Sequence, residues 1–190
     1  MSVIETDRLA LRPWVADDID ALAAIFAVPA VWHYPLGRGL TREESENFLD
    51  RQMHHWEEHG FCMWAAEVKD EKRLAGFVGL AVPTWLPEVL PAVEVGWRLH
   101  PDHWGQGLAT EGGSATLRYG FEHLRLDRII SILMPENAAS GRVMAKLGLQ
   151  HRLETEDPRR GMVLHVREIT ASSWRATLAR ADPGPEGGAG

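Results

Sequence analysis

The residues whose type and spacing most clearly suggest a binding site are two glycines placed just before a helical pattern. The segment His103-Trp-Gly-Gln-Gly-Leu-Ala-Thr-Glu111 follows a strand-like run that ends near Leu99. Gly105 and Gly107 let the backbone adopt conformations that a Cβ would forbid, and they expose consecutive N–H groups at a helix start. Unpaired amides and the positive end of a helix dipole favour an anion such as phosphate. Glycines before a helix also occur in plain loops, so this segment alone leaves both interpretations open.

The spacing of these glycines excludes two better-known phosphate loops. No Gly-Lys-Ser/Thr follows them, as a P-loop requires, and the GxGxxG pattern of dinucleotide-binding folds is missing. A metal site is not expected either. Cys62 is the single cysteine, so neither an internal disulfide nor a CxxC metal site can form. His54-His55 has no spaced acidic partner on its predicted helix.

The composition predicts one globular domain. With 190 residues, 45% of them hydrophobic, the chain can bury a sizeable core. We expect a single domain over residues 1–178 and a disordered tail over the Gly/Pro-rich residues 179–190. The sequence leaves both a monomer and a homodimer open.

The charge pattern bears on possible partners. The formal net charge is −7, and Arg159-Arg160 is the only visible basic cluster, so nucleic acid is not an expected partner. An acidic surface suits a cationic substrate such as an amine, but it also simply keeps a protein soluble. No apolar run approaches the roughly 18 residues of a membrane-spanning helix, and the opening residues lack the features of a secretory signal. We therefore expect a cytoplasmic protein without a membrane partner.

The elements that must position the glycine loop follow from the periodicity of apolar residues. The order is strand, two helices, three strands, helix, strand, helix and two strands, with a last short helix from near Ala171. The strands are expected near residues 8–13, 61–68, 74–82, 93–99, 128–134, 149–156 and 162–169. Three consecutive strands imply an antiparallel meander, and the strand-helix-strand unit around 93–134 implies a parallel crossover. The predicted fold class is α/β (α+β), with a mixed, mostly antiparallel, roughly seven-stranded sheet and helices on both faces.

Four segments carry a resemblance to a known family. They are Thr6-Asp-Arg-Leu-x-Leu-Arg12, Val93-Glu-Val-Gly-Trp-Arg-Leu-His-Pro101, Trp104-Gly-Gln-Gly-Leu-Ala-Thr-Glu111, and Asn137-Ala-Ala-Ser140 continuing to Lys146-Leu-Gly-Leu149. In this order they resemble the GNAT superfamily of N-acetyltransferases, over roughly residues 5–175. Within it they resemble the branch that includes the Rim-type ribosomal-protein N-terminal acetyltransferases.

This resemblance implies a V-shaped split between the fourth and fifth strands that holds acetyl-CoA, the acetyl-donor cosubstrate. The pantetheine arm would bond the backbone of Trp97, Arg98 and Leu99, with Asn137 and Ser140 nearby on the other strand's side. The pyrophosphate would take N–H groups from Trp104, Gly105, Gln106, Gly107, Leu108, Ala109 and Thr110. The family's loop usually begins with Arg or Gln, and Trp104 takes that place here, so the charge of an arginine is absent from it.

Acetylation of an amine needs a base, a stabilised oxyanion and a leaving thiolate. Glu94 is the candidate base, acting through water, because family members often have an acidic residue there; it could equally be a structural strand residue. An amide near Leu99 is the oxyanion donor that the resemblance implies. The family's usual acid is a Tyr at the place of Met144, so Ser140 is the substitute candidate. Ser140 could instead contact the cofactor or belong to the first turn of its helix.

The acceptor side is less defined. Trp32, His33 and Tyr34 lie in the loop that forms one wall of the acceptor site in this family, so they are candidate substrate contacts or hydrophobic packing residues. His100 and His103 flank the glycine loop and are interpreted as loop or surface histidines. The leading hypothesis is acetyl transfer from acetyl-CoA to a primary amine, either a protein N-terminus or a small molecule. The alternative is a non-catalytic acyl-CoA-binding or sensor module on the same fold.

Overall fold

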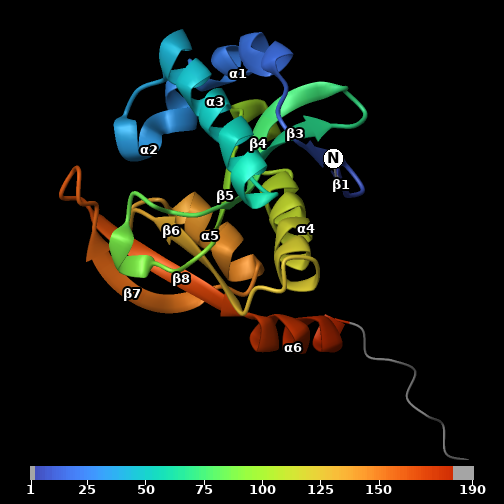
Figure 1. Cartoon of the computed structure of the whole chain (residues 1–190), viewed down its shortest axis with the longest axis vertical. Coiled ribbons are helices and arrows are strands. Elements are labelled where there is room, and N and C mark those ends of the chain that lie inside the picture. The colour runs from blue at the N-terminus through green and yellow to red at the C-terminus, as the bar shows by residue number, and fades with distance from the viewer. Residues whose placement is uncertain (1–2, 182–190) are drawn as a thin grey trace, which may run out of the picture.

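Eight strands form one open sheet in the order β1-β2-β3-β4-β5-β6-β8-β7 (Figure 1). The computed structural model describes residues 3–181. The strands are β1 Ile4–Glu5, β2 Leu9–Arg12, β3 Met63–Val68, β4 Arg73–Ala81, β5 Glu94–Leu99, β6 Arg128–Leu133, β7 Gln150–Glu156 and β8 Val163–Thr170. All neighbours are antiparallel except β5 and β6, which are parallel. The mixed, mostly antiparallel sheet is confirmed. It has one strand more than predicted, because the short β1 pairs with β2.

The helices begin and end where local sequence signals place them. They are α1 Ile19–Phe26, α2 His33–Leu36, α3 Arg42–His59, α4 Leu108–Glu122, α5 Ala138–Lys146 and α6 Ala171–Ala181. At the start of α3, the Thr41 hydroxyl accepts the Glu44 N–H and the Glu44 carboxylate accepts the Thr41 N–H, which forms a capping box. Gly60 ends α3 in the left-handed conformation, with φ of +73°.

Helices cover both faces of the sheet, as predicted. Successive residues of a strand point to opposite faces. On β4, the Phe77 ring lies 6.2 Å from that of Phe26 in α1 and 5.2 Å from that of Phe48 in α3. The next residue, Val78, lies against α4, where its side chain would be 3.2 Å from a Cβ added at Gly112. Therefore α1 and α3 cover one face of β4, and α4 covers the other (Figure 1).

The last helix crosses the predicted end of the domain. α6 continues to Ala181, three residues past the boundary expected at 178. The rest of the expected tail, residues 182–190, lies outside the described residues. Within residues 3–181, no single helix is long and apolar enough to cross a membrane; the bent pair Ala16–Phe26 and Pro29–Leu36 passes that test by length and composition alone.

Candidate active site

The two parallel strands, β5 and β6, pair only at one end. Their register consists of the pair Glu94 and Ile130, and the Ile130 N–H donates to the Val93 carbonyl at 2.9 Å. One residue further along, the Ser131 hydroxyl donates to the Val95 carbonyl at 2.8 Å. Beyond these bonds, the described part of the chain has no ladder between the two strands. The split expected between the fourth and fifth predicted strands is thus confirmed, between β5 and β6.

The far half of β5 has an open edge toward this gap. Backbone polar groups alternate in direction along a strand, so residues in phase with Val95 face β6. Trp97 and Leu99 are in that phase, whereas Arg98 is in the phase that faces β4. The Leu99 carbonyl accepts the indole N–H of Trp104 at 2.8 Å. The backbone N–H and carbonyl of Trp97 and the backbone N–H of Leu99 therefore face the gap. Of the three residues expected to bond the pantetheine arm, only Arg98 is turned away from it.

The loop after β5 presents a row of unpaired amides. Gly105 and Gly107 have φ of +72° and +83°, which glycine adopts without the steric cost of a Cβ. The N–H of Trp104 donates to the preceding turn and that of Thr110 to the Gly107 carbonyl, at 3.0 Å each. For the amides of residues 105–109, no acceptor is found within the described chain. With the positive end of α4 behind them, these amides have the geometry that suits an anion.

A contact between Arg8 and Glu111 holds this loop against the opening strands. Glu111, in the first turn of α4, accepts hydrogen bonds from the Thr6 hydroxyl at 2.6 Å, the Arg8 N–H at 2.8 Å and Arg8 Nε at 2.7 Å. Arg8 Nη1 donates to the Gln106 carbonyl at 2.8 Å. Burial raises the pKa of Glu111, but the hydrogen bonds from Thr6 and Arg8 outweigh it, and the net pKa is lowered. Arg8 thus supplies a positive charge beside the loop, which Trp104 does not.

Glu94 lies where β5 and β6 begin to part. Its side chain is half-buried and points to the face of β5 that α1 and α3 cover, because it shares the phase of Arg98 and its β4 partner Phe77. Burial raises the pKa of Glu94 to about 7, although a backbone hydrogen bond from Ile132 and the charge of Arg98 both lower it. A carboxylate with a pKa near neutrality is well suited to accept a proton.

Helix α5 begins on the β6 side of the gap. Asn137 is its N-cap, and its side-chain carbonyl accepts the Ser140 N–H at 3.1 Å. Ser140 is half-buried, and no hydrogen bond of its hydroxyl is found among the described residues. Met144 is 1% exposed, within the hydrophobic core. A hydroxyl is therefore available at Ser140 and absent from the position where the family usually has one.

The segment between α1 and α3 forms a wall over one face of β5. Arg98 Nη1 donates to the carbonyl of Val31 and, at 3.0 Å, to that of Tyr34. Its guanidinium carbon lies 3.8 Å from the centre of the Trp32 ring. Burial lowers the pKa of Arg98 to about 10, which leaves it charged at neutral pH. The Arg98 side chain therefore fixes this wall to β5, a role that its position in the strand motif did not indicate.

The three residues expected at the acceptor site have different surroundings. Trp32 packs edge-on against Phe26, with ring centroids 5.1 Å apart, and its indole N–H is buried without a partner among the described residues. His33 is exposed. The Tyr34 hydroxyl reaches across to the loop after β6, where it donates to the Glu136 carbonyl at 3.2 Å. Tyr34 therefore lies at the mouth of the gap, whereas Trp32 mainly packs.

The two histidines before the loop differ in burial. His100 and His103 bracket the 3₁₀ turn Pro101–His103, and the His100 ring accepts the Asp102 N–H at 3.3 Å. His103 is only 6% exposed. His103 therefore lies in the loop, as expected, but its side chain is buried and is not at the surface.

Known proteins share this arrangement. The family model described as an acetyltransferase (GNAT) domain matches residues 8–150. An uncharacterized N-acetyltransferase, YoaA, of Bacillus subtilis (strain 168) is 32% identical over 149 residues, which are 78% of this chain and 82% of YoaA. A GNAT-family acetyltransferase from Bacillus anthracis superposes with a TM-score of 0.75 and 25% identity, covering 90% of this chain and 99% of its own.

A more distant structure shares the fold alone. The ribosomal-protein-S5-alanine acetyltransferase from Vibrio fischeri has a TM-score of 0.73 and 20% identity, and covers 92% of this chain and 99% of its own. The family match extends from the start of β2 to the start of β7, and so includes both strands of the gap, the amide loop and α5. This protein belongs to the GNAT superfamily of acetyltransferases.

Proposed function

We propose that this protein transfers an acetyl group from acetyl-CoA to a primary amine. The observation that carries the proposal is the half-buried carboxylate of Glu94, with its pKa raised to about 7, at the point where β5 and β6 separate. A carboxylate with a pKa near 7, at a place where a bound acyl group would lie, suits a general base that works near neutral pH.

The residues of the chain fit acetyl-CoA as the cosubstrate. The unpaired amides of residues 105–109 match a pyrophosphate, and the open edge of Trp97 and Leu99 matches an amide-containing arm that lies along β5 like an added strand. Asn137 caps α5, and that places Ser140 on the other side of the gap. The thioester supplies the acetyl group and a thiolate leaving group.

Each reacting proton has a candidate partner. The acceptor amine loses its proton to Glu94, directly or through water, and the free nitrogen forms a bond to the acetyl carbon. The Leu99 N–H, which faces the gap, stabilises the negative charge that develops on the carbonyl oxygen. The nitrogen bonded to the acetyl carbon then gives up its second proton as the carbon–sulfur bond breaks. The sulfur leaves as a thiolate, or it takes the proton of the Ser140 hydroxyl while that hydroxyl regains a proton from the nitrogen.

The acceptor is a protein N-terminus or a small-molecule amine. The wall formed by His33 and Tyr34 is the surface on which we place the acceptor. An α-amino group has a pKa of about 7.7–8.0, so a base with a pKa near 7 can deprotonate it.

The alternative is an acyl-CoA sensor without turnover. The observation that favours it is Met144, which fills the core where the family usually has a tyrosine acid. A thiolate leaves without a dedicated acid, so this substitution alone does not abolish catalysis.

The test is release of free thiol from acetyl-CoA in the presence of amines. A panel should pair N-terminal peptides with polyamines and aminoglycosides, and calorimetry with CoA should be run in parallel. We expect CoA binding together with acceptor-dependent thiol release. Tight CoA binding with no release on any acceptor would support the sensor instead.

A further inference from the structure

One edge of the Arg98 guanidinium has no partner in the chain. Nη1 donates to the carbonyls of Val31 and Tyr34, but Nε is buried without a hydrogen-bond partner among the described residues. No bond of Nη2 is found there either, and Nη2 is not among the buried atoms, so solvent reaches it. Nε and Nη2 form a planar edge with two donors, which matches a carboxylate or a carbonyl oxygen. Because a buried donor without a partner is costly, this edge is suited to an oxygen of a ligand.

The free edge lies on the same face of β5 as the proposed base. Glu94, Gly96 and Arg98 share one phase of the strand, and the charges of Glu94 and Arg98 are close enough for each to shift the pKa of the other. No hydrogen bond joins these two side chains in the described structure. A Cβ added at the half-buried Gly96 would meet only the flexible end of Met63, at 2.9 and 3.4 Å. No side chain of β5 therefore stands between the base and the free edge.

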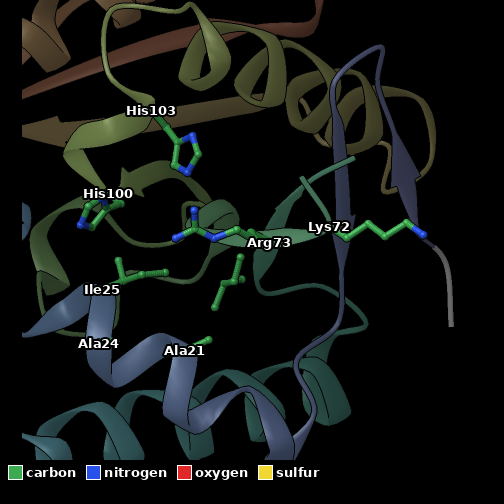
Figure 2. Close-up of a pocket in the computed structure, with 8 residues that line it drawn as sticks. Ala21, Ala24, Ile25, Lys72, Arg73, His100 and His103 are labelled. Carbon is green, nitrogen blue, oxygen red and sulfur yellow. The ribbon is translucent and has the colours of Figure 1, made fainter. Parts of the chain in front are cut away.

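The chain does little to neutralise the charge of Arg98. Among the described residues, Glu94 is the only group whose charge raises the pKa of Arg98, and Glu94 itself, with a pKa of about 7, is partly protonated at neutral pH. Figure 2 shows a contrasting arginine, Arg73, in a cavity beside α1. The Arg73 side chain is 71% exposed and lies 3.8 Å from the Glu71 carboxylate. Water and a carboxylate stabilise Arg73, whereas the buried Nε of Arg98 has neither.

We propose that Arg98 selects acceptors that carry a carbonyl or carboxylate oxygen next to the reacting amine. This inference rests on the proposed acetyl transfer. With the amine at Glu94, the oxygen accepts hydrogen bonds from Nε and Nη2 of Arg98. A peptide N-terminus and a free amino acid both have such an oxygen, on the carbon adjoining the one that bears the amine. A polyamine has no oxygen to offer, and its further positive charges would be repelled by the guanidinium. The acceptor class is therefore the α-amino carbonyl compound.

The test compares two small amines that differ in the carbonyl group. They are alaninamide and sec-butylamine, in which an ethyl group replaces the amide group. Calorimetry measures their binding to the protein saturated with CoA, a complex that has no acetyl group to transfer. At about pH 6, below the α-amino pKa of about 7.7–8.0, both amines are protonated. We expect alaninamide to bind at least about tenfold more tightly, the effect of one hydrogen bond to a charged group.

Arg98→Lys separates this recognition from the structural role of the side chain. Lysine keeps the positive charge and can donate to the carbonyls of Val31 and Tyr34, but it lacks the edge with two donors. The variant should weaken alaninamide binding by about tenfold and leave sec-butylamine nearly unchanged. Arg73→Lys is the control and should affect neither amine. Melting curves and the Kd of CoA show whether each variant folds, and the comparison of the two amines on the wild type requires no variant.

Two results would overturn the inference. One is that the wild type binds alaninamide no more tightly than sec-butylamine. The other is that Arg98→Lys weakens both amines alike, as a purely structural role predicts. Thiol release distinguishes this failure from failure of the proposed function. Similar kcat/KM values for polyamines and peptides would leave acetyl transfer standing and remove the selection by Arg98, whereas no release with any amine would count against acetyl transfer itself.

A further comparison identifies the source of the oxygen. If alaninamide binds more tightly than alanine, the site takes a peptide N-terminus, whose first carbonyl is uncharged. If alanine binds more tightly, the two-donor edge pairs with a free carboxylate and the acceptor is an amino acid. Both results support recognition by Arg98, and they assign it to different compounds.

Discussion

At the scale of single residues, the ionisation of Glu94 should determine how kcat/KM depends on pH. The carboxylate must be deprotonated to act as a base, so kcat/KM of the wild type should rise with pH through about 7. Glu94→Gln should lose that rise and lower kcat/KM by roughly 10²–10⁴-fold, the usual contribution of a general base. The measurement is a pair of pH–rate profiles, and superimposable profiles would remove Glu94 from the mechanism.

Stability gives an independent check on the same pKa. A raised pKa means that the folded state holds the proton more tightly than the unfolded state, so folding is favoured at pH values below the ordinary pKa of 4.5. That contribution is lost as pH rises from there to about 7. Relative to Glu94→Gln, the wild type should therefore lose melting temperature over this interval.

The kinetic parameters of Ser140→Ala distinguish two roles for the Ser140 hydroxyl, proton donation and cofactor contact. If its hydroxyl donates a proton to the leaving sulfur, Ser140→Ala lowers kcat and leaves the KM for acetyl-CoA nearly unchanged. We expect that pattern, because the hydroxyl has no other partner among the described residues while the backbone N–H serves the Asn137 cap. A raised KM with unchanged kcat would assign Ser140 to cofactor contact alone. Ser172→Ala, in the exposed first turn of α6, is the control.

At the scale of elements, the contact between Arg8 and Glu111 couples the first strands to α4. Glu111→Gln keeps one acceptor oxygen but loses the charge that holds Arg8 against the loop. We expect the KM for acetyl-CoA to rise by roughly two- to fivefold, the equivalent of about 0.4–1 kcal/mol, with little change in kcat. The control is Glu46→Gln, which removes a more exposed ion pair, with Arg42, on α3. An equal effect of both variants would contradict a specific role for Glu111.

The conformation of the loop itself can be tested with two glycines of similar backbone geometry. Gly107 and Gly161 have φ of +83° and +66°, and neither has a close contact that an added Cβ would violate. Valine at either position should destabilise the fold by a similar amount, about 1–2 kcal/mol. Only Gly107→Val should weaken CoA binding in calorimetry, because only it turns the amides away from the pyrophosphate. Equal CoA affinities would remove the loop from the binding site.

At the scale of the whole molecule, local patterns predicted the elements and left the contacts between them open. The Thr41 capping box, the stop at Gly60 and the strand preceding the glycine loop are encoded within a few residues, and all three are present. The link from Arg8 to Glu111 spans 103 positions, so no spacing rule could indicate it. The burial of His103 likewise depends on how α1 and β4 meet, which the turn sequence does not specify.

Because the sheet is divided between β5 and β6, binding of CoA should stabilise it. Beyond Ser131 and Val95, no ladder bonds join these strands in the part of the chain that is described, so a bound pantetheine arm would tie the two halves together. Saturation with CoA at a hundred times Kd should add about 2.7 kcal/mol of stability. Amide hydrogen exchange should slow at Trp97 and Leu99 and across residues 105–109. Arg98 is the internal control, because its N–H faces β4 with or without ligand. If protection is confined to residues 105–109, the pyrophosphate is bound but the arm does not pair with β5, and the two halves of the sheet remain joined only at the base of the gap.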